Sequence, residues 1–184
     1  MTALILASGS PRRRQLLGWS NVALTVRPAD IDERIVEGEP PVAYAERLAT
    51  EKAAVGAPDE LVLAADTVVH HEGQIFDKPA DRAEARRHLE ALSGGWHAVT
   101  TGVCLRDGTS STTWSVTTEV RFRTLTTQEI VDYLATGEAD DKAGAYGIQG
   151  RAGSFVAELR GSWTNVMGLP MASVLDALRA RGVA

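Results

Sequence analysis

Residues 4–19 read LILASGSPRRRQLLGW, and this stretch predicts a strand, a short loop and a helix in succession. The apolar run at 4–7 is typical of a buried strand. Ser10 fits the N-cap of the helix, Pro11 its first position and Gly18 its end. The rest of the chain repeats this alternation of strands and helices, which indicates an α/β fold.

The predicted helix opens with three consecutive cations, Arg12, Arg13 and Arg14. Their side chains fall in the first turn, where unpaired backbone N–H groups already make the helix end positive. A bound anion would remove this conflict, because a strand, a loop of small residues and a helix N-terminus form a common phosphate seat. We therefore expect a phosphate site here, with Arg14 a solvated neighbour of the two arginines that bind.

Hydrophobic periodicity and turn residues give the remaining elements. The expected strands are 22–26, 61–69, 98–105, 112–122 and 154–159, and the expected helices are 41–55, 81–94, 126–137 and 170–181. Asp107-Gly108 favours a tight turn between the third and fourth of these strands. The glycine-rich stretch at 141–153 is expected to be a loop whose backbone can approach another group closely. Strands and helices are intermixed along the chain, and some strands are expected to pair as hairpins. This combination predicts a mixed sheet with flanking helices.

Composition limits the kind of protein. The chain has 184 residues, of which 44% are apolar and 23% charged, and a formal net charge of -5. This acidity argues against binding nucleic acid, which needs a broad basic face, and the four scattered tryptophans favour core packing. No apolar run approaches the roughly 20 residues that span a bilayer, so we expect no membrane partner and a cytoplasmic protein. Cys104 is the only cysteine and is expected to be a buried thiol.

Asp66 interrupts the apolar strand expected at 61–69. A buried carboxylate is costly unless a cation, a metal ion or hydrogen bonds stabilise it. A structural ion pair with an arginine is one explanation. A catalytic base or a metal ligand is the explanation we favour, because the same chain carries the expected phosphate site.

Other polar residues have two possible roles each. Lys52 lies on the apolar side of its helix, so its ammonium either enters a cleft or reaches solvent. Glu33 is either a solvated loop acid or an oxygen ligand for Mg²⁺, and Lys78 is by default a surface turn residue. Gln149, in the glycine-rich loop, can donate to and accept from a base edge. The four histidines show no metal-ligand spacing and are expected to be structural or surface residues.

Short motifs along nearly the whole chain carry a family resemblance. They are, in order, ASGSPRR (7–13), IDE (31–33), EKA (51–53), ADT (65–67), KP (78–79), LSG (92–94) with His97, TGV (101–103), KAGAYGIQG (142–150) and VMGLP (166–170). Together they resemble the Maf family of nucleoside triphosphate pyrophosphatases. The departures are small: an additional arginine, Arg14, and Ala64 where relatives often have glycine.

The resemblance implies a single Maf-like domain over 1–184. Its implied fold is a mixed sheet with flanking helices, in two lobes around a substrate groove, as in inosine triphosphatase-like proteins, and homodimers are expected. The implied reaction is hydrolysis of a nucleoside triphosphate to the monophosphate and pyrophosphate with Mg²⁺ or Mn²⁺. The KAGAYGIQG form resembles the branch that acts on dTTP and UTP, with modified pyrimidine nucleotides as a further substrate class.

The resemblance also implies a role for each candidate residue. Asp66 would be the general base for the attacking water and would also touch the metal ion, which Glu33 would help to hold. The phosphates would be bound by Ser8, Arg12, Arg13, Lys52 and Lys78. Base choice would depend on Thr67, Gln149 and one of the leading arginines.

Three alternatives remain open at this point. The chain could be a nucleotide-binding regulator of cell division whose hydrolysis is incidental, since binding and catalysis share phosphate contacts. It could prefer 7-methyl-GTP. It could also be an enzyme of the same fold that removes modified or damaged purine nucleotides.

Overall fold

The computed structural model describes residues 3–183, and the chain divides into two compact units. The first unit runs to Thr67 and also holds Thr101–Val116 and the chain from Gly168 onward. The second unit consists of Val68–Thr100 and Thr117–Met167. Two lobes were expected from the family resemblance.

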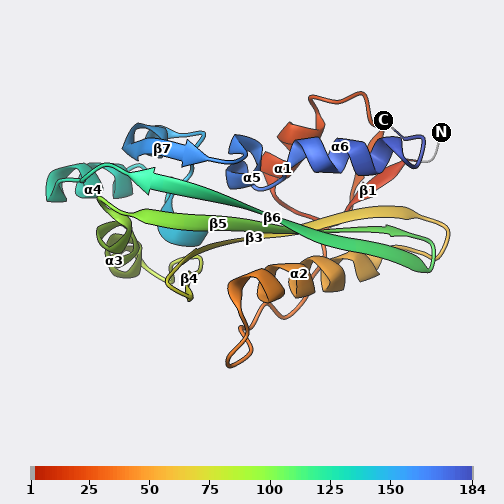
Figure 1. The fold of residues 1–184 in the computed structure, drawn as a ribbon, viewed down its shortest axis with the longest axis horizontal. Coiled ribbons are helices and arrows are strands. Elements are labelled where there is room, and N and C mark those ends of the chain that lie inside the picture. Colours follow the sequence, from red (N-terminus) through yellow and green to blue (C-terminus); the bar gives the residue numbers. More distant parts are fainter. Residues whose placement is uncertain (1–2, 184) are drawn as a thin grey trace. The chain divides into compact units, whose positions relative to one another are not determined.

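The strands form one seven-stranded mixed sheet, as predicted (Figure 1). They are β1 (Leu4–Leu6), β2 (Leu24–Val26), β3 (Leu61–His71), β4 (Gln74–Phe76), β5 (Trp96–Asp107), β6 (Ser110–Phe122) and β7 (Val156–Arg160). Their order is β2-β1-β3-β5-β6-β7, with β4 paired to β3. Strand β1 runs parallel to β2 and β3, whereas β4 and β7 are antiparallel to their partners. The turn of the β5–β6 hairpin contains Gly108 at φ +62°, as the Asp-Gly pair predicted.

The predicted helices begin within one residue of their expected starts, and α5 is additional. The helices are α1 (Pro11–Leu17), α2 (Pro41–Lys52), α3 (Arg82–Leu92), α4 (Thr127–Leu134), α5 (Trp163–Met167) and α6 (Met171–Arg179), with 3-10 turns at Ala53–Val55, Ala143–Ala145 and Arg151–Phe155. The Ser10 side chain accepts a hydrogen bond from the Arg13 backbone N–H at 3.5 Å, at the start of α1. Asp81 caps α3 in the same way, and Thr126 and Glu129 form a reciprocal capping box on α4.

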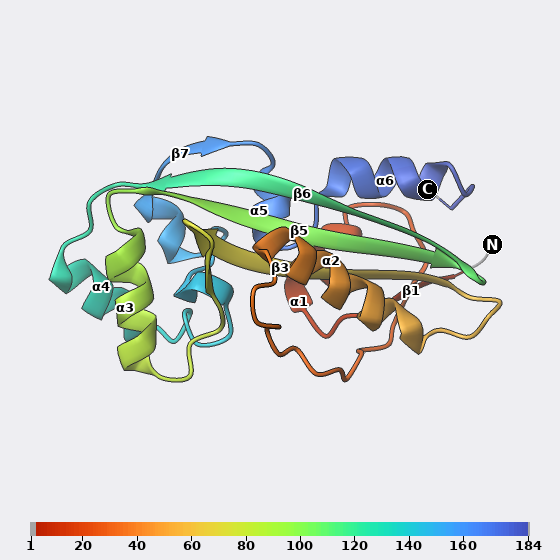
Figure 2. The same cartoon turned by 60° about the horizontal axis from the view of Figure 1, so that its bottom comes forward.

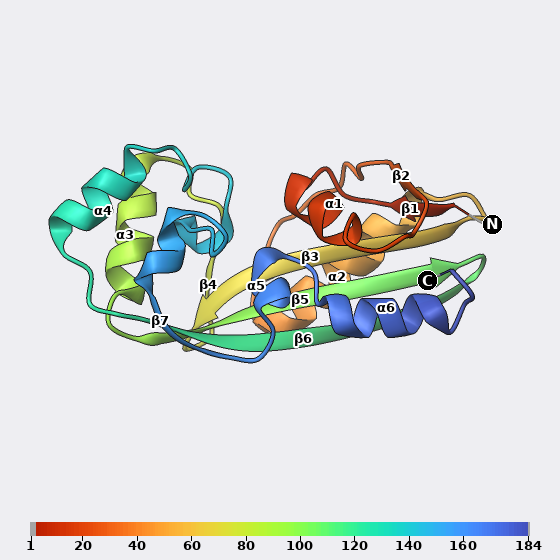
Figure 3. The same cartoon turned by 90° about the horizontal axis from the view of Figure 1, so that it is seen from above.

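In the first unit, α2 and α6 cover opposite faces of the long strands (Figures 1 and 3). Small side chains let α2 approach the sheet closely. A Cβ on Gly102 of β5 would lie 2.3 Å from the carbonyl oxygen of Ala45, so only glycine fits beneath this helix. The apolar core there consists of Ile5, Ala7, Ala49, Ala53, Val62, Ala64 and Cys104. Cys104 is therefore a buried thiol, as expected.

In the second unit, α3 and α4 lie side by side (Figure 2). Its core contains a cluster of rings packed edge to face. Phe122 contacts both His97 and Tyr146 with ring centroids 4.8 Å apart, and the cluster continues through Phe155 to Tyr133. This aromatic cluster holds the glycine-rich loop against the sheet, because Tyr146 belongs to that loop.

Several expectations were wrong in detail. Strand β4 and helix α5 were not predicted, since each is too short to show a periodic pattern. The helix expected at 41–55 ends at Lys52 and continues as a 3-10 turn. Trp19 and Trp163 are 60% and 40% exposed rather than packed in the core, because both stand at helix ends that face solvent. Across residues 3–183 no helix is long and apolar enough to cross a membrane.

Candidate active site

Arg13 is the central cation of the candidate site. Its side chain is 9% exposed, and its guanidinium donates three hydrogen bonds. Nε donates to the carbonyl oxygen of Gly168 at 2.8 Å, Nη1 to Ser8 Oγ at 3.1 Å and Nη2 to Thr67 Oγ1 at 3.0 Å. All three acceptors are neutral, and no carboxylate of residues 3–183 hydrogen-bonds to this group. The positive charge of Arg13 is therefore held in place without being neutralised by direct contact.

Electrostatics at Arg13 supports the same view. Burial lowers the pKa of the guanidinium, and the positive charge of Arg12 lowers it further, whereas the negative charges of Asp66 and Glu33 raise it. Burial and Arg12 therefore both disfavour the charged form of the guanidinium. A bound anion would offset both effects, because its negative charge stabilises that form. Of the three leading arginines, Arg12 is half-buried and Arg14 exposed, in agreement with the expectation that Arg14 is a solvated neighbour.

The acceptors of Arg13 are themselves organised. Ser8 Oγ also accepts a hydrogen bond from the Ser10 backbone N–H at 3.2 Å, which links it to the cap of α1. Thr67 Oγ1 lies 3.0 Å from Thr101 Oγ1, on the neighbouring strand β5. Ser8 and Thr67 thus each have a second partner that limits the rotation of the hydroxyl, which holds the guanidinium in one orientation.

The second cation of the site, Lys52, lies between two carboxylates. Its Nζ is 2.6 Å from Asp66 Oδ1 and 2.6 Å from Glu33 Oε1. The Lys52 and Asp66 side chains are only 9% and 12% exposed, whereas that of Glu33 is 40% exposed. Lys52 therefore neither reaches solvent nor stands alone, and the cation that stabilises Asp66 is a lysine rather than an arginine. The three side chains meet because Ala49 of α2 packs in one buried cluster with Val62 and Ala64 of β3.

The two carboxylates can be tested as a metal site. Within the part of the chain that the structure describes, no group of three or more His, Cys, Asp and Glu side chains could hold an ion. Mg²⁺ typically takes only one or two protein carboxylates, and substrate phosphates and waters complete its shell. Asp66 and Glu33 converge on one point with hard oxygen donors, and Lys52 contacts only Oδ1 of Asp66. This donor set fits Mg²⁺ or Mn²⁺ bound together with a nucleotide.

Seven of the predicted site residues lie in the first unit, and six of them form the contacts just described. They are Ser8, Arg13, Glu33, Lys52, Asp66 and Thr67, with Arg12 beside Arg13 in the first turn of α1. The other two, Lys78 and Gln149, lie in the second unit. Lys78 is exposed, and its backbone N–H donates to Asp77 Oδ1 at 2.7 Å.

Gln149 is exposed at the end of the glycine-rich loop. A Cβ on Gly147 would lie 3.1 Å from Gln149 Nε2 and 2.8 Å from Lys142 Cε, so both side chains pass close to that glycine. The Gly147 backbone N–H donates to Tyr133 Oη at 3.2 Å, and Tyr146 Oη lies 2.8 Å from His97 Nε2. The loop is thus anchored from beneath while Gln149 faces solvent.

Two residues of the network were missed by sequence reasoning. Gly168 supplies a backbone carbonyl, which no side-chain pattern reveals, and Thr101 acts through Thr67. The available signal was indirect: each belongs to one of the short motifs, VMGLP and TGV. The φ of +122° at Gly168 explains why that motif contains glycine.

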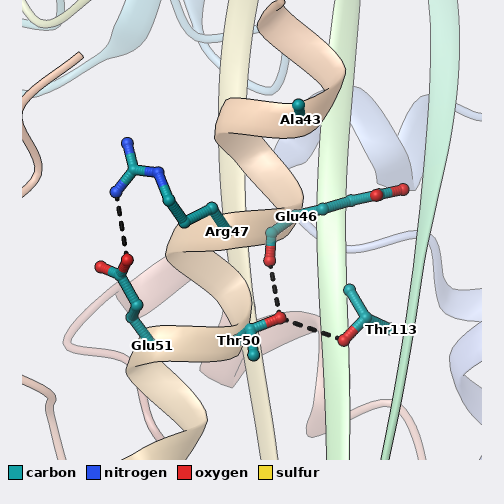
Figure 4. A pocket seen from close by; sticks show the side chains of 6 residues that line it. All are labelled: Ala43, Glu46, Arg47, Thr50, Glu51 and Thr113. Carbon is teal, nitrogen blue, oxygen red and sulfur yellow. Dashed lines mark hydrogen bonds and ion pairs between the residues drawn. The ribbon is translucent and has the colours of Figure 1, made fainter. Parts of the chain in front are cut away.

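A separate shallow pocket lies on the outer surface of α2 (Figure 4). Its lining residues are Ala43, Glu46, Arg47, Thr50, Glu51 and Thr113, a set that includes none of the predicted site residues. Thr50 Oγ1 is 3.1 Å from Thr113 Oγ1, and Arg47 pairs with Glu51 at 3.2 Å. These contacts are ordinary for an exposed helix face, so the pocket adds nothing to the site.

Comparison with known proteins gives the same family along nearly the whole chain. The family model described as "Maf-like protein" matches residues 3–181. The dTTP/UTP pyrophosphatase of Anaeromyxobacter dehalogenans (strain 2CP-C) is 54% identical over 183 residues, which cover 97% of this chain and 94% of that protein. The dTTP/UTP pyrophosphatase of Chromobacterium violaceum is 49% identical over 178 residues, covering 92% and 90% of the two chains.

Among solved structures, the Staphylococcus aureus Ham1 protein matches with a TM-score of 0.45 and 13% sequence identity. The match covers 66% of this chain and 72% of that one. A likeness this distant carries no inference about chemistry.

Proposed function

The chain belongs to the Maf family, and we propose that it is a nucleoside triphosphate pyrophosphatase that hydrolyses dTTP and UTP to the monophosphate and pyrophosphate. Relatives about half identical to it bear the name dTTP/UTP pyrophosphatase. The observation that carries the proposal is the environment of Arg13, a buried cation whose three acceptors are all neutral. Such a charge calls for an anionic ligand, and a triphosphate supplies one.

Phosphate binding involves four cations. Arg13 and Ser8 bind phosphate oxygens in the first unit, with Arg12 beside them in the first turn of α1. Lys52 and Lys78 contribute further positive charge. These groups stabilise the charge that builds up on the leaving pyrophosphate.

Asp66 is the general base. It accepts the proton of a water whose oxygen bonds to the α-phosphorus, while the bond from that phosphorus to the bridging oxygen breaks and pyrophosphate leaves. Positioned proton transfer of this kind typically contributes about 10²–10⁴-fold to the rate. Lys52 fixes Oδ1 of this carboxylate at 2.6 Å and so orients the other oxygen.

Glu33 and Asp66 hold the divalent ion, Mg²⁺ or Mn²⁺. When bound, the ion supplies positive charge to the phosphate oxygens and acidifies water. The chain's own contribution is the pair of carboxylates, which Lys52 keeps together at 2.6 Å from each.

Base choice depends on Gln149 and Thr67. Gln149 presents an amide that can pair with the donor and acceptor edge of uracil or thymine. Thr67 acts through Arg13, because its Oγ1 accepts a hydrogen bond from Arg13 Nη2 at 3.0 Å. The proposal further includes a single domain over 1–184, a homodimer and a cytoplasmic location.

The proposal is tested by pyrophosphate release from a panel of triphosphates: dTTP, UTP, pseudouridine triphosphate, CTP, GTP and 7-methyl-GTP, each with Mg²⁺ or Mn²⁺. We expect fast release with the uracil and thymine nucleotides. Preference for 7-methyl-GTP or a damaged purine nucleotide would contradict the substrate assignment. Tight nucleotide binding without release would instead favour a regulator.

Two variants test the residues that carry the reaction. Asp66→Asn is expected to bind nucleotide and lose nearly all turnover, whereas Asp176→Asn, an exposed carboxylate paired with Arg179, should behave as wild type. Arg13→Ala is expected to raise KM and lower kcat, with kcat/KM falling about 100-fold, and Arg14→Ala is its matched control. Equal kinetics for the two arginine variants would remove Arg13 from the phosphate site.

A further inference from the structure

Glu33 lies in a segment with no regular structure. Residues 27–40, between β2 and α2, form neither helix nor strand, and the Glu33 side chain is 40% exposed. A carboxylate on such a segment normally samples many positions. Its place beside Asp66 therefore requires contacts that hold its backbone as well as its side chain.

The backbone at Glu33 is held by a tyrosine of α2. Tyr44 is 3% exposed, and its hydroxyl donates to the carbonyl oxygen of Glu33 at 2.8 Å. A buried phenol hydroxyl needs a partner, so this contact is costly to break.

The next carbonyl is held from the same helix. Arg47 Nη2 donates to the carbonyl oxygen of Arg34 at 3.0 Å, and the Arg47 fork also binds both carboxylate oxygens of Glu39 at 2.7 Å. The Arg47 guanidinium lies over the Tyr44 ring at 5.5 Å from its centroid. Tyr44 and Arg47 therefore contact each other and hydrogen-bond to the two successive carbonyl oxygens of Glu33 and Arg34.

Lys52 completes the arrangement two turns further along α2, where its Nζ contacts the Glu33 carboxylate at 2.6 Å. One helix thus fixes the main chain of Glu33 with Tyr44 and its side chain with Lys52. We propose that Tyr44 is a positioning residue for the metal-binding carboxylate of Glu33, with Arg47 as its support. This inference rests on the proposed function, in which Glu33 helps to hold the divalent ion.

The test is a double-mutant cycle on metal affinity. The dissociation constant of Mn²⁺ is measured by electron paramagnetic resonance in the presence of saturating α,β-methylene-UTP, which cannot be hydrolysed at the α-phosphorus. Tyr44→Phe keeps the ring beneath Arg47 and removes only the hydroxyl. We expect it to raise the Mn²⁺ dissociation constant roughly 10-fold, the lower end of what loss of an outer partner costs a metal site.

The decisive comparison uses the Glu33→Gln background. Glu33→Gln alone should weaken Mn²⁺ binding, and adding Tyr44→Phe should then change nothing more, because the tyrosine acts through that carboxylate. Thr50→Val is the matched control, since it removes a hydroxyl from the same helix on the face shown in Figure 4. Circular dichroism establishes that each variant is folded. Should Tyr44→Phe fail to fold, Arg47→Gln replaces it, with the same expected loss of affinity and of additivity.

The outcomes separate the inference from the function on which it rests. Unchanged affinity in Tyr44→Phe, together with weakened binding in Glu33→Gln, overturns the positioning role and leaves the metal role of Glu33 intact. Full additivity of the two variants also overturns it, because the tyrosine would then act elsewhere. Unchanged affinity in Glu33→Gln overturns the metal assignment itself.

Discussion

Arg13 Nε donates to the carbonyl oxygen of Gly168 at 2.8 Å, across 155 positions of sequence. The contact joins the first helix of the chain to the turn that precedes its last helix. Gly168 adopts a φ of +122°, a backbone conformation that residues with a side chain rarely adopt. The carbonyl therefore points at Arg13 only because the residue is glycine.

Gly168→Ala is expected to lower kcat/KM about 10-fold while reducing stability by about 1–3 kcal/mol, the usual cost of forcing a side chain into a strained backbone region. The carbonyl would turn away and leave Arg13 one acceptor short. Gly182→Ala is the control, because Gly182 also has a positive φ, +68°, but nothing lies within 4 Å of its Cβ position. If both variants lose stability and neither loses activity, the Gly168 carbonyl does not orient Arg13.

Gly102→Ala tests the close packing of α2 on β5. The added Cβ would lie 2.3 Å from Ala45 O, and its three nearest atoms all belong to the backbone of Ala45 and Glu46, so the helix itself must move. We expect a loss of about 1–3 kcal/mol in the free energy of unfolding, which is typical of overpacking. We also expect reduced turnover, because Lys52 belongs to the same helix and would be displaced. Urea unfolding measures the first effect. Gly95→Ala, whose Cβ would meet its nearest atom at 3.9 Å, should change neither quantity.

His97 predicts a specific acid sensitivity. Burial lowers the pKa of its imidazole to about 3, from an ordinary value of 6.5, with the nearby His71 and His70 adding to the effect. In the unfolded chain the ring takes up a proton near pH 6.5, so acidification favours unfolding between pH 6.5 and 3. The contribution of His97 to the free energy of unfolding is therefore fully present above pH 6.5. It falls by up to about 1.4 kcal/mol per pH unit as the pH drops from 6.5 toward 3.

The measurement is the melting temperature of wild type and His97→Gln from pH 7 to pH 4. The glutamine can still hydrogen-bond to Tyr146 but cannot take up a proton, so its curve should be flatter. Carboxylates affect both proteins alike and cancel in the comparison. Parallel curves would show that His97 does not govern the acid response.

Gln149→Ala is expected to lower the ratio of UTP to GTP turnover several-fold, because the amide that pairs with the pyrimidine edge is lost while the phosphate contacts remain. Thermal stability should not change, since the side chain is exposed. Gln74→Ala, another exposed glutamine of the same unit, serves as control. An unaltered ratio would place base recognition on other residues.

Local signals in the sequence predicted much of the fold. The cap at Ser10 and the capping box at Thr126 and Glu129 correctly marked helix starts, because those contacts involve residues three apart. Strand β4 and helix α5 escaped prediction because each is too short to show a periodic pattern, and only contacts in the folded chain define them. Val69 pairs with Phe76 in β4, and Asn165 of α5 donates to the carbonyl oxygen of Val99 at 3.0 Å.

The candidate site shows the same division. Charged side chains such as Lys52 and Asp66 stand out in an apolar context and could be selected from the sequence. Their pairing could not, because the sequence left open whether Lys52 reached solvent and whether Asp66 met an arginine. The carbonyl of Gly168 gave no signal at all, since every residue has one and only the folded chain shows which carbonyl faces a cation.

The Arg13–Gly168 contact also has a consequence for the order of synthesis. A growing chain holds every side chain proposed for the site once Gln149 has been added, yet Arg13 still lacks one of its three acceptors. That acceptor arrives only with residue 168. A ribosome-bound chain stalled before this point should therefore bind nucleotide less well than one that extends well beyond it, so the binding site is completed by a backbone carbonyl rather than by its last side chain.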